Sequence, residues 1–145
     1  MSGILCISKL AVLGMHSMAL IAGSDKRLNA DSLALLMNAS KSHVAKVAQI
    51  LVKHHLLVSE RGPKGGFELK NPSNQTHLLE IYEVFEGKLG GSCCILNTGK
   101  CTLLHCVFGE LSGKFTREFN VYLKNTKLSD ITEKSGNPGN KPPFM

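Results

Sequence analysis

The stretch SKSHVAKVAQILVKHHLLVSERGPKGGFEL, residues 40–69, decides the fold of this 145-residue chain. In its first half, apolar residues recur at the i, i+3, i+4 and i+7 spacing of an amphipathic helix, at Val44, Val47, Ala48 and Leu51. Ser40 stands where the N-cap of that helix is expected. The second half has two short strand-forming runs on either side of the basic, Gly/Pro-rich loop 61–66, which predicts a β-hairpin.

The residues before Ser40 predict the first helix of a helix-turn-helix. Asn29 is a suitable N-cap for a short helix over residues 30–37, and Asn38, Ala39 and Ser40 then form a three-residue turn. Two short helices joined in this way, with a basic hairpin directly after them, are typical of a winged helix-turn-helix.

An apolar segment precedes this unit. Residues 4–22 predict a helix that is apolar on most faces and is therefore largely buried. Residues 10–23 also resemble the core of a secretory signal peptide, but only Lys9 precedes them as a positive charge, and His16 and Ser17 interrupt them. A buried helix is the preferred interpretation, so we expect a cytoplasmic protein without membrane contact.

The residues after the hairpin predict further helices. An amphipathic pattern over residues 77–86 ends near Gly87, a longer helix is expected from about Thr102, and a short helix follows Leu128. The longer helix would carry a single apolar stripe, formed by Leu104, Phe108, Leu111, Phe115, Phe119 and Tyr122.

The chain therefore predicts a mainly α fold with a small β-hairpin wing, arranged in four regions, of which the second and third overlap. Residues 1–88 are expected to form the winged helix-turn-helix, and residues 89–106 a cysteine-rich sensor loop. Residues 102–134 would form the long helix and the short terminal helix. Residues 135–145 are rich in Gly, Pro, Asn and Lys and predict a disordered tail.

Basic side chains are concentrated in the first half of the chain. Residues 1–70 contain nine Lys and Arg against four Asp and Glu, whereas the remaining 75 residues contain eight against seven. This asymmetry favours a polyanionic partner for the first half. In a winged helix the residues that contact DNA lie at the start of the second helix and in the wing. Here these are Ser40, Lys41, Ser42, His43, Lys46, Gln49, Arg61, Lys64 and Gly65.

Three segments of the chain resemble one family of bacterial transcriptional regulators, the IscR/NsrR/CymR type. They are ISKLA (7–11), the stretch at 40–69 and LLEIYEVFEG (78–87), and the wing RGPKGGF (61–67) is the most specific element. The resemblance covers about residues 5–130 and implies a homodimer on a palindromic operator in double-stranded DNA. It also implies a long C-terminal helix that crosses to the partner subunit, so that the apolar stripe would serve dimerisation. Packing within one chain would produce the same periodicity.

Four of the five cysteines lie within fourteen residues: Cys93, Cys94, Cys101 and Cys106. An odd, clustered set argues against a secreted disulfide scaffold and favours metal, cluster or redox chemistry. Thiolates hold iron in iron–sulfur clusters and also suit zinc. The candidate ligands are Cys94, Cys101 and Cys106, with Cys93 as the alternative first ligand. The resemblance implies an iron–sulfur cluster on these cysteines, as in many members of the family.

The resemblance does not extend to a fourth ligand. Some members have an acid at the position of Lys9, and others have a His one turn after the third cysteine, where this chain has Gly109. Cys6, His105 and Glu110 are the replacements that the sequence offers. A cofactor-free thiol switch on the same cysteines, a structural zinc site and inert thiols therefore stand beside the cluster-based sensor as alternatives.

An enzyme is not expected. The sequence has no Ser/His/Asp order, phosphate-binding loop or carboxylate pair, and the neighbours His105 and Cys106 would point about 100° apart on a helix. His54 and His55 are expected on the surface. A winged-helix module that binds only proteins is the alternative to DNA binding, and a shallow salt dependence of binding would identify it.

Overall fold

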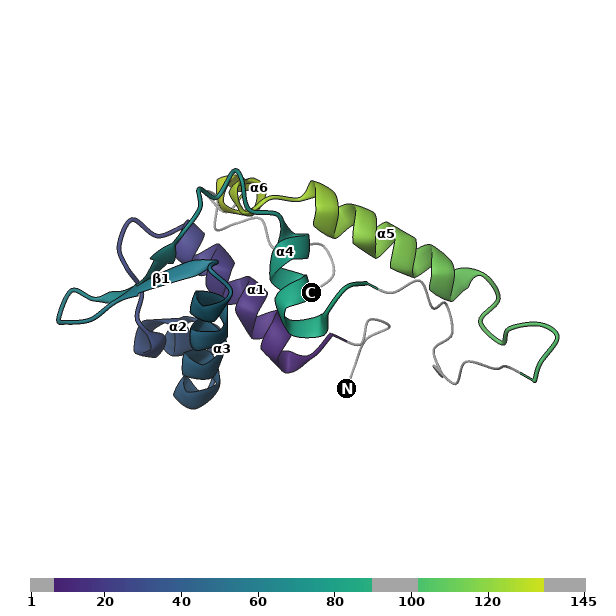
Figure 1. The fold of residues 1–145 in the computed structure, drawn as a ribbon, viewed down its shortest axis with the longest axis horizontal. Helices are drawn as coiled ribbons and strands as arrows, with labels where there is room; N and C mark the ends of the chain where they lie inside the picture. Colours follow the sequence, from purple (N-terminus) through teal and green to yellow (C-terminus); the bar gives the residue numbers. More distant parts are fainter. Residues whose placement is uncertain (1–6, 90–101, 135–145) are drawn as a thin grey trace.

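The computed structural model describes residues 7–89 and 102–134 (Figure 1). These residues form six helices and one two-stranded antiparallel sheet, which confirms the predicted mainly α fold with a β-hairpin wing. In chain order the elements are α1 (Lys9–Ala22), α2 (Ala30–Met37), α3 (Lys41–Lys53), β1 (Leu57–Glu60), β2 (Gly66–Leu69), α4 (Leu78–Glu86), α5 (Leu111–Asn125) and α6 (Leu128–Lys134).

Helix α1 contacts α2, α3, α4, α6 and β2, and so lies at the centre of the fold. Six of its fourteen residues are buried, as expected for the apolar helix predicted here. The helix begins at Lys9 rather than near Ile4, because Ser8 has an extended backbone and its hydroxyl accepts a hydrogen bond from the amide of Ala11 at 3.1 Å. Residues 4–6 lie outside the described residues. Across the described ranges, no helix combines the length and the apolar character needed to cross a membrane.

Helices α2 and α3 form the predicted helix-turn-helix. The side chain of Asn29 accepts a hydrogen bond from the amide of Ser32 at 2.8 Å and caps α2. Asn38 ends α2 in the left-handed conformation, with φ of 49°, which a short polar side chain tolerates. Ser40 takes the N-cap position of α3 as predicted, but its hydroxyl makes no capping hydrogen bond. Instead it lies 2.8 Å from the hydroxyl of Ser42.

One apolar core joins the helices to the hairpin. The stripe predicted for α3 is completely buried, at 0% exposure: Val44, Val47, Ala48 and Leu51. It packs with residues that are equally buried, among them Leu33 of α2, Ile81 of α4 and Leu128 of α6. Full burial of each Val or Leu side chain contributes about 1.5–3 kcal/mol, so α3 is held firmly in place.

Helix α4 packs on α1 at a point where α1 has no side chain. A Cβ at Gly14 would lie against the ring of Phe85, only 2.6 Å from its Cζ atom. Helix α5 in turn packs on α4, where the rings of Phe119 and Tyr82 meet edge to face with their centroids 5.4 Å apart. This is a favoured geometry for an aromatic pair.

The long helix begins later than the sequence predicts. Helix α5 starts at Leu111 and not near Thr102, so Leu104 and Phe108 precede the helix and lie in turns and irregular backbone. Gly109 has a left-handed backbone with φ of 57°. A left-handed residue interrupts the α-helical backbone that the apolar spacing alone would continue. The short helix predicted after Leu128 is confirmed as α6.

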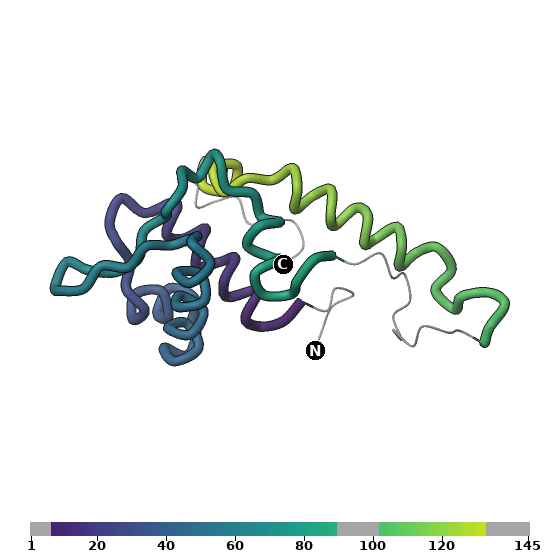
Figure 2. Tube along the Cα trace, in the orientation of Figure 1, coloured from purple at the N-terminus to yellow at the C-terminus, as the bar shows by residue number. Residues whose placement is uncertain are grey.

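The wing and the segment before α5 lie at opposite ends of the molecule (Figure 2). Helix α5 extends away from the body and is attached through its C-terminal part. The amide of Leu78 donates to the carbonyl of Thr126 at 2.9 Å, and the amide of Leu128 donates to the carbonyl of Thr76 at 3.0 Å. These bonds join the start of α4 to the link between α5 and α6.

Candidate DNA interface and cysteine segment

Helix α3 presents a polar surface on the side opposite its buried stripe. All five of its residues that were predicted to contact DNA are exposed: Lys41, Ser42, His43, Lys46 and Gln49. The backbone amides at a helix N-terminus also favour a phosphate group. Because the buried stripe fixes α3, these side chains start from a rigid element, which is what reading base edges in a major groove requires.

One residue of this surface already has a charged partner. The Nζ atom of Lys41 lies 2.8 Å from Oδ1 of Asp31, in the first turn of α2. Both side chains are about two-thirds exposed, at 65% and 66%, and an ion pair this exposed is weak. A DNA phosphate would therefore compete with Asp31 for the ammonium group of Lys41.

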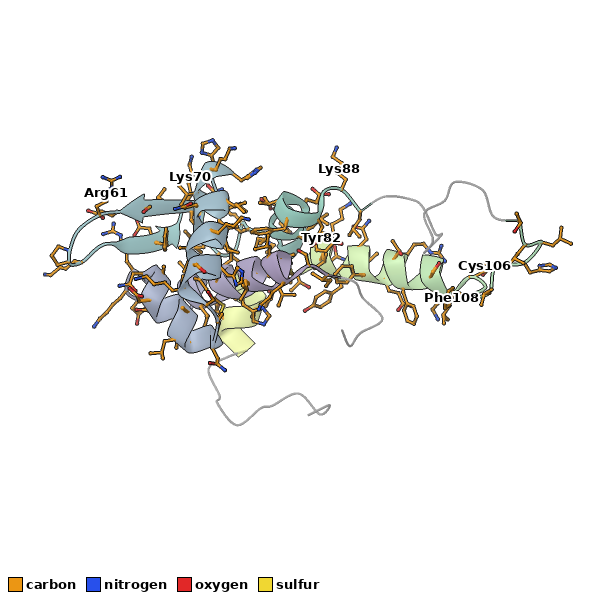
Figure 3. The ribbon with its side chains drawn as sticks, turned by 90° about the horizontal axis from the view of Figure 1, so that it is seen from below. Arg61, Lys70, Tyr82, Lys88, Cys106 and Phe108 are labelled. Atoms are coloured by element: carbon orange, nitrogen blue, oxygen red, sulfur yellow. The ribbon has the colours of Figure 1, made fainter. Side chains whose placement is uncertain are left out.

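The wing carries its two predicted basic side chains in the loop that joins its strands. Strands β1 and β2 pair antiparallel, and Arg61 and Lys64 lie exposed between them. Figure 3 shows Arg61 at the opposite end of the molecule from Cys106. Gly65 closes the loop: a Cβ at this position would overlap the carbonyl oxygen of Glu60 and lie 2.8 Å from the carbonyl carbon of Arg61. Any other residue would force the backbone of the wing to move.

The stem of the hairpin carries a charge cluster that was not among the predicted features. Arg27, in the link between α1 and α2, forms an ion pair with Glu60 of β1. Its Nε and Nη2 atoms each lie 3.2 Å from an oxygen of Glu68 on β2. The hydrogen bond to Glu68 is the main cause that raises the pKa of Arg27 above its ordinary value.

The positions of Glu60 and Glu68 in the sequence give one signal for this cluster. Glu60 pairs with Gly66 and Glu68 follows two residues later on β2, so both carboxylates lie on one face of the hairpin. Like charges that are diagonal neighbours on one face of a sheet repel each other and favour a nearby cation. The sequence alone does not indicate which cation this is.

Among the described residues there is one cysteine, Cys106, whose thiol is free and exposed. The neighbouring candidates His105 and Glu110 are also exposed, and so is Lys9 at the start of α1. Within residues 7–89 and 102–134, no group of three or more His, Cys, Asp or Glu could hold a metal ion. The remaining cysteines lie outside the described residues: Cys6, Cys93, Cys94 and Cys101.

The apolar stripe predicted along the long helix divides into two parts. Phe119 turns inward to Tyr82 of α4. The other members are exposed: Leu104, Phe108, Leu111, Phe115 and Tyr122. At 3.6 residues per turn, Leu111, Phe115 and Tyr122 lie within about 40° of one another around α5. We call these three residues the α5 strip; they are 53%, 36% and 56% exposed.

The sequence as a whole is similar to known regulators. Residues 7–134 match the model of the Rrf2 family, described as an iron-dependent transcriptional regulator. The chain is 32% identical over 81 residues to the HTH-type transcriptional regulator BadM of Rhodopseudomonas palustris, a match that covers 55% of this chain and 52% of BadM. It is 29% identical over 93 residues to the HTH-type transcriptional regulator NsrR of Oceanobacillus iheyensis, covering 58% of this chain and 63% of NsrR. The match thus spans about half of BadM and somewhat more of NsrR.

The fold is similar to that of CymR, the global cysteine regulator of B. subtilis. The two structures superimpose with a TM-score of 0.73 at 21% sequence identity, and the match covers 91% of this chain and 99% of CymR. At this level of identity the likeness bears on the fold alone, and it confirms the winged-helix architecture. The predicted resemblance to IscR/NsrR/CymR-type regulators is confirmed by these matches together.

Proposed function

Because the chain belongs to the Rrf2 family of transcriptional regulators, which are not enzymes, we propose that it binds a palindromic operator in double-stranded DNA as a homodimer. Helix α3 reads base edges in the major groove, and the wing contacts the adjacent backbone and minor groove. The proposed contact residues are Ser40, Lys41, Ser42, His43, Lys46, Gln49, Arg61, Lys64 and Gly65.

The two-sided construction of α3 is the observation that best supports this function. Its inner stripe is completely buried, while its outer side chains are exposed and include both base-reading and phosphate-neutralising types. Gln49 has the amide group that pairs with adenine, and Lys46 neutralises phosphate. The basic wing lies in the same region of the molecule, and the excess of basic residues in the first half of the chain attracts a polyanion.

The exposed α5 strip supports the homodimer. Leu111, Phe115 and Tyr122 expose apolar side chains on one side of a helix that extends away from the body (Figure 1). Two copies related by a two-fold axis would cover each other's strips, and Leu104 and Phe108 would extend this contact. In such a dimer the two α3 helices would enter successive major grooves about 34 Å apart, which is why the operator is expected to be palindromic.

Selection of the best-bound duplexes from a random-sequence pool, followed by fluorescence anisotropy over a series of salt concentrations, tests this function. We expect a palindromic consensus and an affinity that falls about a thousandfold between 50 and 200 mM salt. Lys46→Gln should weaken binding to all duplexes and lower the salt slope by about one. Lys88→Gln, a matched loss of charge on an exposed residue after α4, should change neither quantity. A shallow salt dependence without a consensus would identify a protein-binding module instead.

We also propose that the cysteine segment at 93–106 switches the affinity for the operator. The thiolates of Cys94, Cys101 and Cys106, with Cys93 as the alternative first ligand, have the donor chemistry of an iron–sulfur cluster site. Cys106 supports this assignment because its thiol is exposed and unpaired. The iron dependence in the description of the family supports it as well. When bound, such a cluster would supply a redox-active iron centre.

The chain's own contribution to the switch lies in the position of Cys106. This residue precedes α5 by only a few residues, at the end of α5 that is distant from the body (Figure 3). Ligation or oxidation of the segment would therefore act first on the dimer contact made by α5. A change of about 1–3 kcal/mol in that contact is enough to alter operator affinity by a factor of about 5–150.

Anaerobic absorbance spectroscopy of the purified protein, with iron, zinc and acid-labile sulfide quantified, tests the cofactor. Visible charge-transfer bands with near-integral iron and sulfide content are the expected result. A colourless protein that also fails anaerobic reconstitution would favour the cofactor-free thiol switch, and stoichiometric zinc would favour a structural site. The switch itself is refuted if the triple variant with Ala at Cys94, Cys101 and Cys106 responds to oxidant and iron depletion as the parent does.

A further inference from the structure

We propose that Arg27 is a positioning residue for the wing: by holding Glu60 and Glu68 together, it fixes the direction in which the hairpin presents Arg61 and Lys64. The inference rests on the proposed function, in which the wing contacts DNA. Arg27 lies in the link between α1 and α2, outside both the recognition helix and the wing.

The side chain of Arg27 connects the link to both strands of the hairpin at once. It pairs with Glu60 near the end of β1, and it makes two 3.2 Å contacts with the carboxylate of Glu68 on β2. A guanidinium group has a planar fork of donors that can bind two carboxylates in fixed directions, which a lysine ammonium cannot do. The Arg27 side chain is 35% exposed, so it is partly enclosed by the groups that it holds.

The backbone beside Arg27 reinforces the same attachment. Leu28 forms an isolated β-bridge with Phe67, in which the Phe67 amide donates to the Leu28 carbonyl at 2.9 Å and the Leu28 amide donates to the Phe67 carbonyl at 3.4 Å. A Cβ at Gly66 would lie 2.9 Å from the Leu28 carbonyl, so this approach requires glycine. The link is therefore held against β2 by one β-bridge. A two-stranded hairpin is marginally stable alone, and added contacts of this kind fix its orientation.

Electrostatics give Arg27 a second effect on DNA binding. Without its guanidinium, the carboxylates of Glu60 and Glu68 would repel each other on one face of the stem, and both would repel a DNA phosphate near the wing. Loss of Arg27 would thus weaken DNA binding for two reasons, through charge and through orientation. The experiment has to separate them.

A double-mutant cycle between Arg27 and Arg61 isolates the orientation effect. The probe is the duplex that the parent protein selects from a random pool, and the readout is the dissociation constant by anisotropy. Arg61→Gln is expected to weaken binding about tenfold in the parent. In the Arg27→Gln background the same substitution should weaken binding less than threefold. Without Arg27 the wing has no fixed orientation, so Arg61 contributes little to DNA binding even when it is present. Lys46→Gln on α3 should weaken binding equally in both backgrounds.

Two further variants separate the electrostatic effect of Arg27 from its effect on the orientation of the wing. In the triple variant with Gln at positions 27, 60 and 68 no carboxylate remains on the stem, so a purely electrostatic role predicts affinity equal to or above that of the parent. Positioning predicts that the triple variant stays weak. Lys26→Gln is the matched control for loss of one charge in the same link, because Lys26 forms no ion pair in the described part of the chain. It should leave the cycle between Arg27 and Arg61 intact.

The outcomes distinguish this inference from the function on which it rests. If Arg61→Gln has no effect in the parent, the wing does not contact DNA and the positioning role fails, whereas a parent protein that selects no duplex would refute the proposed function itself. If Arg61→Gln weakens binding equally with and without Arg27, the DNA contact stands and the positioning role is refuted. Far-UV circular dichroism and the melting temperature establish that each variant is folded. Should Arg27→Gln fail to fold, Arg27→Lys is used in the same cycle, because it keeps the charge and loses the fork.

Discussion

Replacement of Gly14 by alanine is expected to destabilise the protein, although alanine is the better helix former. Gly14 is buried in the middle of α1, where α4 approaches. An added Cβ would overlap Cε2 of the Phe85 ring and lie 2.6 Å from Cζ and 3.1 Å from Cδ2. The ring or the helix would therefore have to move to make room for the methyl group.

The size of the effect follows from two opposing terms. Glycine to alanine within a helix stabilises by about 1 kcal/mol. Extra volume in a packed core typically destabilises by about 1–3 kcal/mol, and overlap with two atoms of one ring places Gly14 in the upper part of that range. We expect a net loss of about 1–2 kcal/mol. For a chain of this size this corresponds to a melting temperature that is lower by about 3–6 °C.

Thermal and urea denaturation of Gly14→Ala measure this loss, with Gly23→Ala as the control. Gly23 is the C-cap of the same helix, with φ of −87°, and a Cβ there would make only ordinary contacts, the nearest at 3.5 Å. The control should keep or slightly raise the melting temperature. The double variant Gly14→Ala/Phe85→Leu should lose less than the sum of its two single variants, because the smaller side chain leaves room. A Gly14→Ala protein more stable than the parent would refute the close packing of α1 on α4.

Three further results are expected from other contacts. Asp31→Asn should tighten binding to the selected duplex about two- to fivefold by anisotropy, because it frees Lys41 for phosphate and removes a negative charge; unchanged or weaker binding would contradict this. Phe119→Ala should lower the free energy of unfolding in urea by about 1–2 kcal/mol through loss of the ring contact with Tyr82, and an unchanged midpoint would place α5 elsewhere. In Tyr122→Phe, the one remaining tyrosine, Tyr82, should titrate by ultraviolet absorbance above the ordinary tyrosine range, because burial and then Glu86 raise its pKa. The raised pKa means that the folded state favours the neutral phenol. The stability that Tyr82 contributes is therefore present at neutral pH and is lost as the pH rises through the higher pKa of the folded state.

The features that sequence predicts well here are those with a local physical cause. The apolar spacing of α3 required one buried side, and all four of its residues are buried. Asn29 caps the helix that directly follows it. The wing required glycine and proline between two short strands, and the hairpin forms there. Each of these patterns lies within about ten residues, where helix and turn geometry leave few alternatives.

The features that sequence reasoning missed depend on a single backbone torsion or on distant residues. The spacing of Leu104 and Phe108 continues the stripe of α5, but one left-handed residue at Gly109 stops the helix before it reaches them. The ion pairs of Arg27 join residues that are 33 and 41 positions apart in the sequence. A single sequence shows two acids on the hairpin and several cations elsewhere, and only the fold selects the pair.

The distance between Cys106 and the wing limits how the proposed switch can act. Helix α5 spans about 22 Å at 1.5 Å per residue, and its anchored end reaches the body through Phe119, the link to α6 and α4. Between that anchor and the outer face of α3 lies a core whose key members, Leu33, Ile81 and Leu128, are completely buried. Packed cores resist small continuous deformations, so a change at Cys106 would leave the shape of α3 within its own subunit intact. The change would act at the α5 strip, whose side chains are not packed within their own subunit. It would therefore rotate one whole subunit against the other. The switch would then change the separation of the two α3 helices on DNA while the contacts of each helix stay the same.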